Sequence, residues 1–278
     1  MLKIRILSIV MSALFLMSCT AELKVRINPT PQKIEMAKKG SLNVAKGFAP
    51  EGESELVAQS LVHLNITENG VPTSFIIDKA IAQTDSMLDK SGAYILEVNK
   101  EGIFVSAYDE RGAFYAIQTL KQLSTENEIP YMTITDYPDM PYRGVVEGFY
   151  GTPWSHETRV SLLDFYGKFK MNSYLYGPKD DPYHSSPNWR LPYPEEEAQK
   201  IKELVGASKR NYVDFIWAIH PGKDIKWNES DYKKLYEKFE SMYDLGIRSF
   251  ALFFDDIEGI GTRPDMQAQL LNRLHTEF

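Results

Sequence analysis

The chain has 278 residues, of which 43% are hydrophobic and 25% are charged, a composition that is ordinary for one large or two medium globular domains. Its formal net charge is −7 at pH 7, and no basic block is interleaved with aromatic residues, which argues against a nucleic-acid partner. The only cysteine is Cys19, so intrachain disulfides are excluded and stability must come from the core.

Residues 1–19 have the organisation of a bacterial lipoprotein signal peptide. Two basic residues precede an apolar segment over residues 6–17 that is too short to span a bilayer. A leucine, a methionine and a small residue then precede Cys19, which resembles the lipobox, where cleavage leaves a lipidated cysteine. The alternative is an ordinary secretory signal with an incidental cysteine. Because Thr20 follows, we expect an exported lipoprotein of the outer membrane, periplasmic or surface-facing, whose membrane contact is a lipid anchor at Cys19 only.

Residues 20–138 are predicted to form a small α+β domain. Apolar, β-branched runs predict strands over residues 94–98 and 102–107, joined by a short polar turn as a hairpin. Apolar residues at helical spacing predict helices over residues 56–64 and 111–120. This mixture of elements indicates a sheet with helices packed against it.

From residue 139 the pattern changes to strands alternating with helices, after a proline-punctuated boundary at residues 136–141. Strands are predicted over 142–147, 172–176, 212–219 and 249–254, and helices over 155–169, 195–209, 230–243 and 265–275. Near-continuous apolar strands in such a series favour a parallel sheet covered by helices. We therefore expect residues 139–278 to be the N-terminal half of a (β/α)8 barrel, truncated because a full barrel takes about 250 residues. The alternative is a complete doubly wound sheet of four strands.

Two adjacent carboxylates, Asp255 and Asp256, end the apolar, aromatic-rich run of the fourth predicted strand, which predicts a buried strand that carries the pair into a buried pocket. Neighbouring residues on a regular strand face opposite sides, so both can enter one pocket only where the strand gives way to a loop. Close like charges and apolar surroundings raise the pKa of one carboxyl group, which would leave one acid and one carboxylate at neutral pH. Glycosidases need such a pair. The structural alternative is a helix N-cap or a solvated pair.

Three motifs at predicted strand ends resemble glycoside hydrolase family 84, the β-N-acetylglucosaminidases that include O-GlcNAcases and bacterial hyaluronidase-like enzymes. They are RGVVEGFYGTPWS over residues 143–155, YLYGPKDDPY over residues 174–183 and FFDDI over residues 253–257. Residues 111–120 are similar to a helix of the small N-terminal domain of hexosaminidases. The resemblance covers most of the mature chain and implies an α/β fold, in which a hexosaminidase-type α+β domain precedes the first half of the barrel.

The resemblance also implies a retaining, substrate-assisted mechanism on a glycan or glycoprotein that ends in N-acetylglucosamine. The sugar's own acetamido oxygen would attack the anomeric carbon and form an oxazoline. Asp255 would accept the acetamido N–H and stay ionised beside the developing positive charge. Asp256 would be the general acid and then the general base, which requires a raised pKa.

Three further residues are implied as substrate contacts by the same motifs. Lys179 would hold sugar hydroxyls, the carbonyl of Gly148 would contact another hydroxyl, and Tyr150 would line the acetamido pocket. Their structural alternatives are a surface lysine and a core aromatic residue. His220 follows the third barrel strand and is equally explained as a core histidine, so it is not included. No metal-spaced cluster or phosphate-binding loop is present, and no cofactor is implied.

The family's later strands supply a tyrosine, asparagines and an aspartate, and the chain ends before them. We therefore expect the complete gene product to be active and the 278-residue chain to have little or no activity. One alternative function is a non-catalytic glycan-binding lipoprotein, against which the intact carboxylate pair speaks. Another is a related family with an Asp-Glu pair, against which Asp256 speaks.

Overall fold

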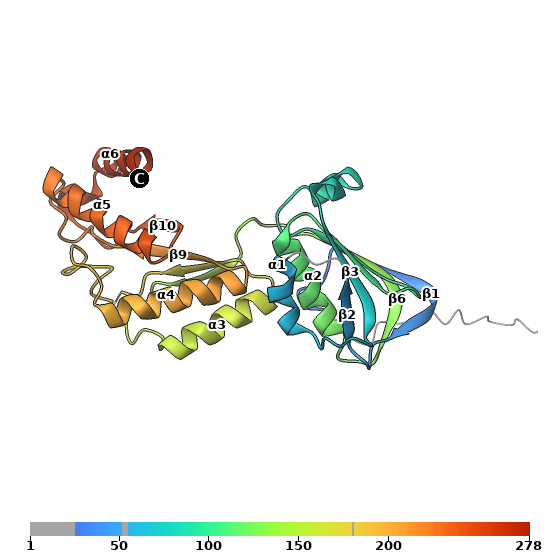
Figure 1. The fold of residues 1–278 in the computed structure, drawn as a ribbon. Coiled ribbons are helices and arrows are strands. Elements are labelled where there is room, and N and C mark those ends of the chain that lie inside the picture. Colours follow the sequence, from blue (N-terminus) through green and yellow to red (C-terminus); the bar gives the residue numbers. More distant parts are fainter. Residues whose placement is uncertain (1–25, 52–54, 180) are drawn as a thin grey trace, which may run out of the picture.

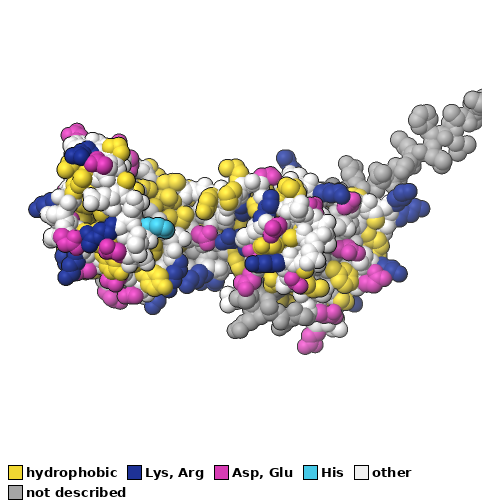
Figure 2. Space-filling view, turned by 90° about the horizontal axis from the view of Figure 1, so that it is seen from above, with side chains coloured by type: hydrophobic (Ala, Val, Ile, Leu, Met, Phe, Trp, Pro, Cys, Tyr) yellow, Lys and Arg dark blue, Asp and Glu magenta, His cyan; other side chains and the backbone are white. Residues whose placement is uncertain are grey.

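Two lobes follow one another along the chain in the computed structural model, which describes residues 26–51, 55–179 and 181–278 (Figure 1). The space-filling view shows these lobes joined by a narrower waist (Figure 2). The predicted signal peptide over residues 1–19, including the lipidation at Cys19, lies outside the described residues. None of the helices that the structure describes is both long enough and apolar enough to cross a membrane.

The first lobe is built on a mixed six-stranded sheet in the order β1-β6-β4-β5-β3-β2. The strands are β1 (Lys33–Asn43), β2 (Phe48–Glu51), β3 (Val71–Ile77), β4 (Tyr94–Val98), β5 (Ile103–Ala107) and β6 (Glu128–Asp136), and the helical elements are α1 (Glu55–Ser60), η1 (Leu61–His63), η2 (Lys79–Gln83), η3 (Ser86–Leu88) and α2 (Glu110–Leu123). The predicted hairpin is confirmed, because β4 and β5 pair antiparallel. The helix predicted over residues 56–64 is split into α1 and the 3-10 turn η1.

Helix α2 lies against this sheet and carries much of the first core. Asp109 begins it as an N-cap, with its carboxylate accepting from the backbone N–H of Gly112 at 2.9 Å. Gly112 is required by close packing, since a Cβ there would lie 2.2 Å from the carbonyl oxygen of Ala93 on the sheet side. The buried face includes Phe114 and Ile117, both fully buried. The predicted helix over residues 111–120 is therefore confirmed and slightly longer.

The second lobe is a parallel four-stranded sheet in the order β10-β9-β8-β7. Its elements are β7 (Gly144–Glu147), α3 (His156–Lys168), β8 (Ser173–Tyr176), α4 (Glu195–Arg210), β9 (Asp214–Ile219), α5 (Glu229–Asp244), β10 (Ser249–Leu252), η4 (Gly259–Thr262) and α6 (Pro264–Glu277). A doubly wound sheet reverses its strand order at a switch point. These strands instead follow the sequence order without reversal, as barrel strands do, so the predicted fold class is confirmed.

The barrel helices cover one face of this sheet. Leu163 of α3, Leu204 of α4 and Leu235 of α5 form one hydrophobic cluster with Phe215 and Trp217 of β9. On the opposite face, Val146 of β7 is 59% exposed. Since the four strands are parallel, their carboxyl ends meet at one edge, where the predicted site residues lie.

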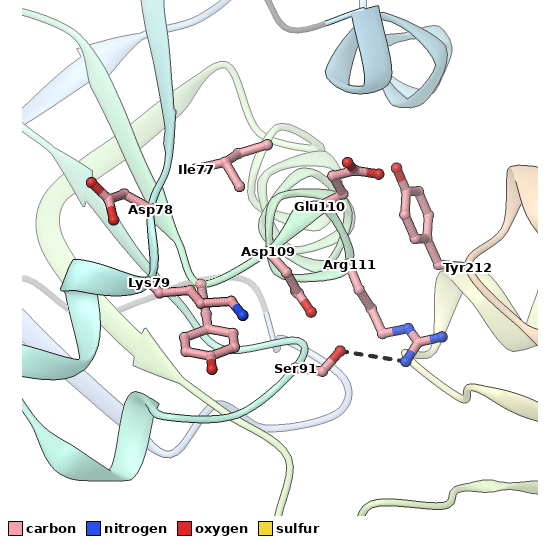
Figure 3. A pocket seen from close by; sticks show the side chains of 9 residues that line it. Ile77, Asp78, Lys79, Ser91, Asp109, Glu110, Arg111 and Tyr212 are labelled. Carbon is pink, nitrogen blue, oxygen red and sulfur yellow. Dashed lines mark hydrogen bonds between the residues drawn. The ribbon is translucent and has the colours of Figure 1, made fainter.

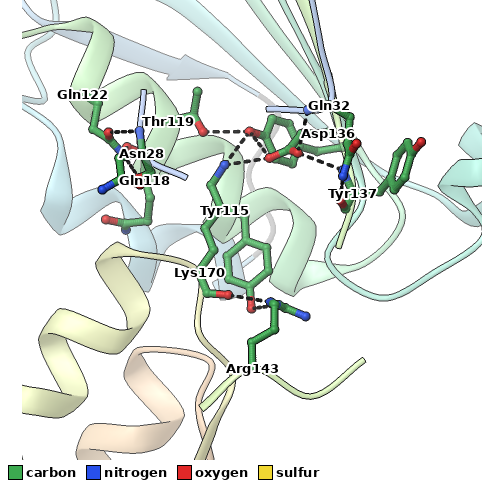
Figure 4. A network of polar contacts seen from close by, with 11 residues as sticks. Asn28, Gln32, Tyr115, Gln118, Thr119, Gln122, Asp136, Tyr137, Arg143 and Lys170 are labelled. Atoms are coloured by element: carbon green, nitrogen blue, oxygen red, sulfur yellow. Dashed lines mark hydrogen bonds and ion pairs between the residues drawn. The ribbon is translucent and has the colours of Figure 1, made fainter. Parts of the chain in front are cut away.

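The two lobes are joined by a buried polar network at the other edge of the barrel sheet (Figure 4). The ammonium of Lys170 donates to Asp136 at 2.7 Å and to the hydroxyl of Tyr94 at 2.9 Å. Burial lowers the pKa of Lys170, and the Asp136 carboxylate opposes this effect. Arg143, just before β7, donates to the hydroxyl of Tyr115 on α2 at 3.0 Å. The predicted boundary between residues 138 and 139 lies in the connection between β6 and β7.

Candidate active site

The loops that follow β7, β8 and β10 bring five predicted site residues to the same edge: Gly148, Tyr150, Lys179, Asp255 and Asp256. The loops are tied to one another through their backbones. The N–H of Lys179 donates to the carbonyl of Phe149 at 3.3 Å, and the N–H of Phe253 donates to the carbonyl of Ile219 at 2.8 Å. The structure therefore places these side chains together from segments that are far apart in the sequence.

Asp255 is the anchored carboxylate of the pair. Its Oδ2 accepts a hydrogen bond from the ammonium of Lys179, whose side chain is only 8% exposed. Burial by itself would raise the pKa of Asp255, but the hydrogen bond and the positive charge of Lys179 lower it overall, with a smaller effect from His220. A carboxylate with these neighbours stays ionised at neutral pH.

Asp256 has a different conformation and a different partner. Its φ is 51°, in the left-handed region that a non-glycine residue rarely adopts. This backbone conformation takes the side chain out of the strand alternation. Its Oδ2 accepts a hydrogen bond from the hydroxyl of Tyr150 at 3.2 Å. The strand regularity ends at Leu252, so the pair lies where the strand has given way to a loop, and its two members face separate partners.

The predicted burial of the pair is not found among the described residues. The side chain of Asp255 is 53% exposed, and Asp256 is also exposed. The reason is geometric, because β7 to β10 and their loops supply one wall of the site and leave the barrel-interior face open. The apolar residues Phe253 and Phe254 lie beneath the pair and pack into that wall, where Phe254 stacks with Trp227 at 5.8 Å.

Lys179 lies between the loop that carries Tyr150 and the loop that carries Asp255. Its ammonium contacts Asp255 and lies 5.6 Å from the ring centroid of Tyr150 and 5.8 Å from that of Phe253. An ammonium has three donors, so a sugar hydroxyl could share Lys179 with the carboxylate. Gly148 is partly exposed, and a Cβ there would lie 3.2 Å from a methyl group of Val146. A side chain at this position would therefore crowd the loop that starts the site.

A buried carboxylate beneath the first loop was not predicted as functional. Glu147, the last residue of β7, is fully buried and accepts from Arg159 through both oxygens, at 2.9 and 2.8 Å. It also accepts from the hydroxyl of Tyr174 and from the backbone N–H of Trp154 at 3.1 Å. These contacts fix both ends of the loop that carries Tyr150. The sequence signal that could have identified Glu147 is a charged residue at a strand position that faces the helices.

His220 was left out at the sequence level, yet it contacts the pair directly. Its Nε2 lies 2.7 Å from the backbone oxygen of Asp255 and 3.4 Å from the Oδ1 of that residue. A second buried histidine, His184, lies beside it and holds the backbone oxygen of Ala218 through Nδ1 at 3.0 Å. Burial is the main cause of the lowered pKa of His184. In the sequence, the only signal that either histidine lies near the site was its position in a segment that follows a strand.

A groove with a volume of about 710 Å³ lies elsewhere (Figure 3). It borders the junction of the lobes, beside Tyr212 at the amino-terminal edge of the barrel sheet. Its polar groups serve the fold. Asp78 and Asp109 cap helices, and Arg111 pairs with Asp214 at 3.1 Å. No group of three His, Cys, Asp or Glu side chains that could hold a metal occurs in the described parts of the chain.

Two family models match consecutive parts of the chain. Residues 143–278 match a β-N-acetylglucosaminidase family, and residues 24–137 match domain 2 of glycosyl hydrolase family 20. Two solved structures are similar over 91% of the chain. These are CpGH84B, with a TM-score of 0.79 and 36% identity, and CpGH84D, with a TM-score of 0.77 and 33% identity. The chain covers 48% of each of those structures.

Curated proteins also match. The chain is 45% identical over 116 residues to a protein O-GlcNAcase of Rattus norvegicus, which is 41% of this chain and 13% of the relative. It is 29% identical over 183 residues to an N,N'-diacetylchitobiase of Vibrio harveyi, 63% of this chain and 20% of the relative. It is 32% identical over 222 residues to a β-hexosaminidase of Vibrio vulnificus, 74% of this chain and 24% of the relative. The chain thus spans less than a quarter of the length of these relatives.

Proposed function

We propose that Asp255 and Asp256 are the catalytic pair of a glycoside hydrolase, since residues 143–278, which contain them, match the β-N-acetylglucosaminidase family. The substrate proposed is a glycan or glycoprotein that ends in β-linked N-acetylglucosamine, which the enzyme removes from the end of the chain. The observation that carries the proposal is the unequal setting of the two adjacent carboxylates. One is held ionised by Lys179, and the other accepts from a tyrosine hydroxyl and has no ion pair with any residue that the structure describes. The named activities of the relatives support the same reaction class.

The mechanism we propose is retaining and substrate-assisted. The acetamido oxygen attacks the anomeric carbon as the glycosidic bond breaks, and Asp256 gives its proton to the departing oxygen. Asp255 accepts the acetamido N–H and stabilises the positive charge that develops on the oxazoline. In the second half, Asp256 takes a proton from the water that attacks the anomeric carbon, which opens the oxazoline and restores the sugar's acetamido group. A lowered pKa at Asp255 supports its part, because a protonated Asp255 could not offset that charge.

The neighbouring residues then act as substrate contacts. Lys179 donates to a sugar hydroxyl while it keeps its bond to Asp255. Tyr150, which reaches Asp256, lines the acetamido side of the site, and the carbonyl of Gly148 accepts from a second hydroxyl. Because an exposed tyrosine ring and a glycine backbone allow close approach of a pyranose ring, this arrangement suits a terminal sugar.

The test is turnover of an aryl β-N-acetylglucosaminide and of its N-trifluoroacetyl analogue by the full-length protein. Fluorination makes the acetamido oxygen a poorer nucleophile, so we expect a steep fall in kcat for the analogue. Equal rates would mean that a carboxylate of the protein attacks instead. Asp255→Asn and Asp256→Asn should each lower kcat by at least about 100-fold, and Asp244→Asn, at the exposed end of α5, should not. Binding without turnover by the folded wild type would favour a glycan-binding module.

We also propose export and lipidation at Cys19, which rest on the sequence of residues 1–19 alone. Metabolic labelling with an alkynyl fatty acid should mark the wild-type protein and fail to mark Cys19→Ser. Labelling that persists in the variant would contradict the proposal.

A further inference from the structure

His220 directly follows β9, the third barrel strand, and its imidazole contacts the segment that follows the fourth. Its backbone N–H donates to the carbonyl of His184 at 2.8 Å, and His220 forms an isolated parallel bridge with Ser185 in the loop after β8. The side chain is 1% exposed. A buried ring on a hydrogen-bonded backbone has little freedom, so the sheet itself fixes the position of the contact that the ring makes with Asp255.

The chemistry of that contact assigns the proton on the ring. A carbonyl oxygen only accepts, so the Nε2 that lies 2.7 Å from the Asp255 oxygen must carry the hydrogen. The Nδ1 atom is buried and has no hydrogen-bond partner in the described parts of the chain. The hydrogen bond from Nε2 to the Asp255 carbonyl is therefore the contact by which the ring holds the backbone of the pair.

The carbonyl that His220 holds belongs to the peptide group between Asp255 and Asp256. Rotation of this group changes the φ of Asp256, which is 51°. For a non-glycine residue the left-handed region is strained. The net stabilisation from one hydrogen bond is of the same size as that strain. The His220 hydrogen bond therefore offsets the strain that turns Asp256 out of the strand alternation and toward Tyr150.

We propose that His220 is a positioning residue for the carboxylate pair: it fixes the peptide group between Asp255 and Asp256 and thereby the directions of both side chains. Lys179 holds the Oδ2 of Asp255 from the other side, so the first carboxylate is fixed at its backbone and at its tip. The proposal depends on the proposed function only in that the pair is taken to be catalytic. The conformational part stands on the geometry alone.

The test compares three variants of the full-length protein with an aryl β-N-acetylglucosaminide as substrate. His220→Phe keeps the ring volume and removes the donor, and His220→Gln keeps an N–H near the position of Nε2. His184→Phe is the matched control, because it also removes a ring hydrogen bond to a backbone carbonyl in the same buried layer. Because small displacements of reacting groups cost on the order of 100-fold in rate, we expect His220→Phe to lower kcat about 10- to 100-fold with a smaller change in KM. We expect His220→Gln to recover most of that loss and His184→Phe to stay near the wild type.

A crystal structure of His220→Phe supplies a readout that does not depend on activity. The φ of Asp256 should leave the left-handed region, and a φ unchanged from the wild type would overturn the proposal. Equal losses of kcat in His184→Phe and His220→Phe would also overturn it, since the effect would then be one of general packing. If His220→Phe does not fold, His220→Asn replaces it, because its amide is too short to reach the carbonyl. A wild type without turnover would refute the proposed function, while the conformation of Asp256 would still decide the role of His220.

Discussion

Lys238 offers the sharpest test of the electrostatics of the barrel lobe. It lies on α5, is 3% exposed, and its ammonium donates to the carbonyl of Leu191 at 2.5 Å over the ring of Tyr193. Burial lowers its pKa from the usual 10.5 to about 8, against the opposing charge of Asp181. That fall corresponds to roughly 3 kcal/mol of stability lost when the folded chain must carry the charge.

The sign of the pH effect follows from proton binding. Below about pH 8 both states hold the proton, and the full penalty applies. Between about pH 8 and pH 10.5 the unfolded chain still holds the proton that folded Lys238 has lost, so the stability rises with pH. From about pH 7 to about pH 9.5, linkage gives a gain of about 2 kcal/mol in the wild type relative to Lys238→Met.

The assay is urea unfolding of the full-length protein and of Lys238→Met at both pH values. At each pH, the free energy of unfolding of Lys238→Met is subtracted from that of the wild type. The change of this difference with pH is the quantity of interest, because the contributions of other titrating groups cancel in it. Lys234→Met on the exposed side of the same helix is the matched control and should show no such change. Parallel pH dependences for the wild type and Lys238→Met would refute the assigned burial penalty.

Three further predictions concern stability. Glu147→Gln leaves the part-buried Arg159 cation without its buried carboxylate and should cost about 3–5 kcal/mol in urea unfolding, whereas a cost below about 1 kcal/mol would contradict the pairing. Asp136→Asn removes the partner of buried Lys170 and should expose the connection between the lobes to limited proteolysis, and wild-type resistance would argue against its role in the joint. Gly144→Ala would place a Cβ 1.8 Å from a backbone oxygen of the neighbouring strand, so we expect a loss of at least about 1–3 kcal/mol, and an unchanged melting temperature would contradict this packing.

The sequence predicted the barrel lobe well because its signals are local. Each strand is a short apolar run, and two of the helices begin at a recognisable side-chain cap, Ser155 before α3 and Asn228 before α5. The first lobe was predicted less completely. Strand β1 alternates polar and apolar residues only at its start and then continues through two lysines and a glycine, and β3 contains a proline, so the sequence signal for each strand is weak. Their strand conformation comes from pairing with β6 and β5, which are distant in sequence.

The candidate site shows the same division between local and long-range information. Motifs at the strand ends identified Lys179 and Asp255, since each lies in a recognisable run of residues. The contact of His220 with Asp255 could not be read in this way, because it joins residues 35 positions apart and depends on the register of β9 against β10. The burial of the pair was wrongly predicted for a related reason, since apolar neighbours in sequence line the wall beneath Asp255 without covering it. Position along a strand therefore indicates which edge a residue reaches, whereas its exposure and partners depend on which other strands and loops meet there.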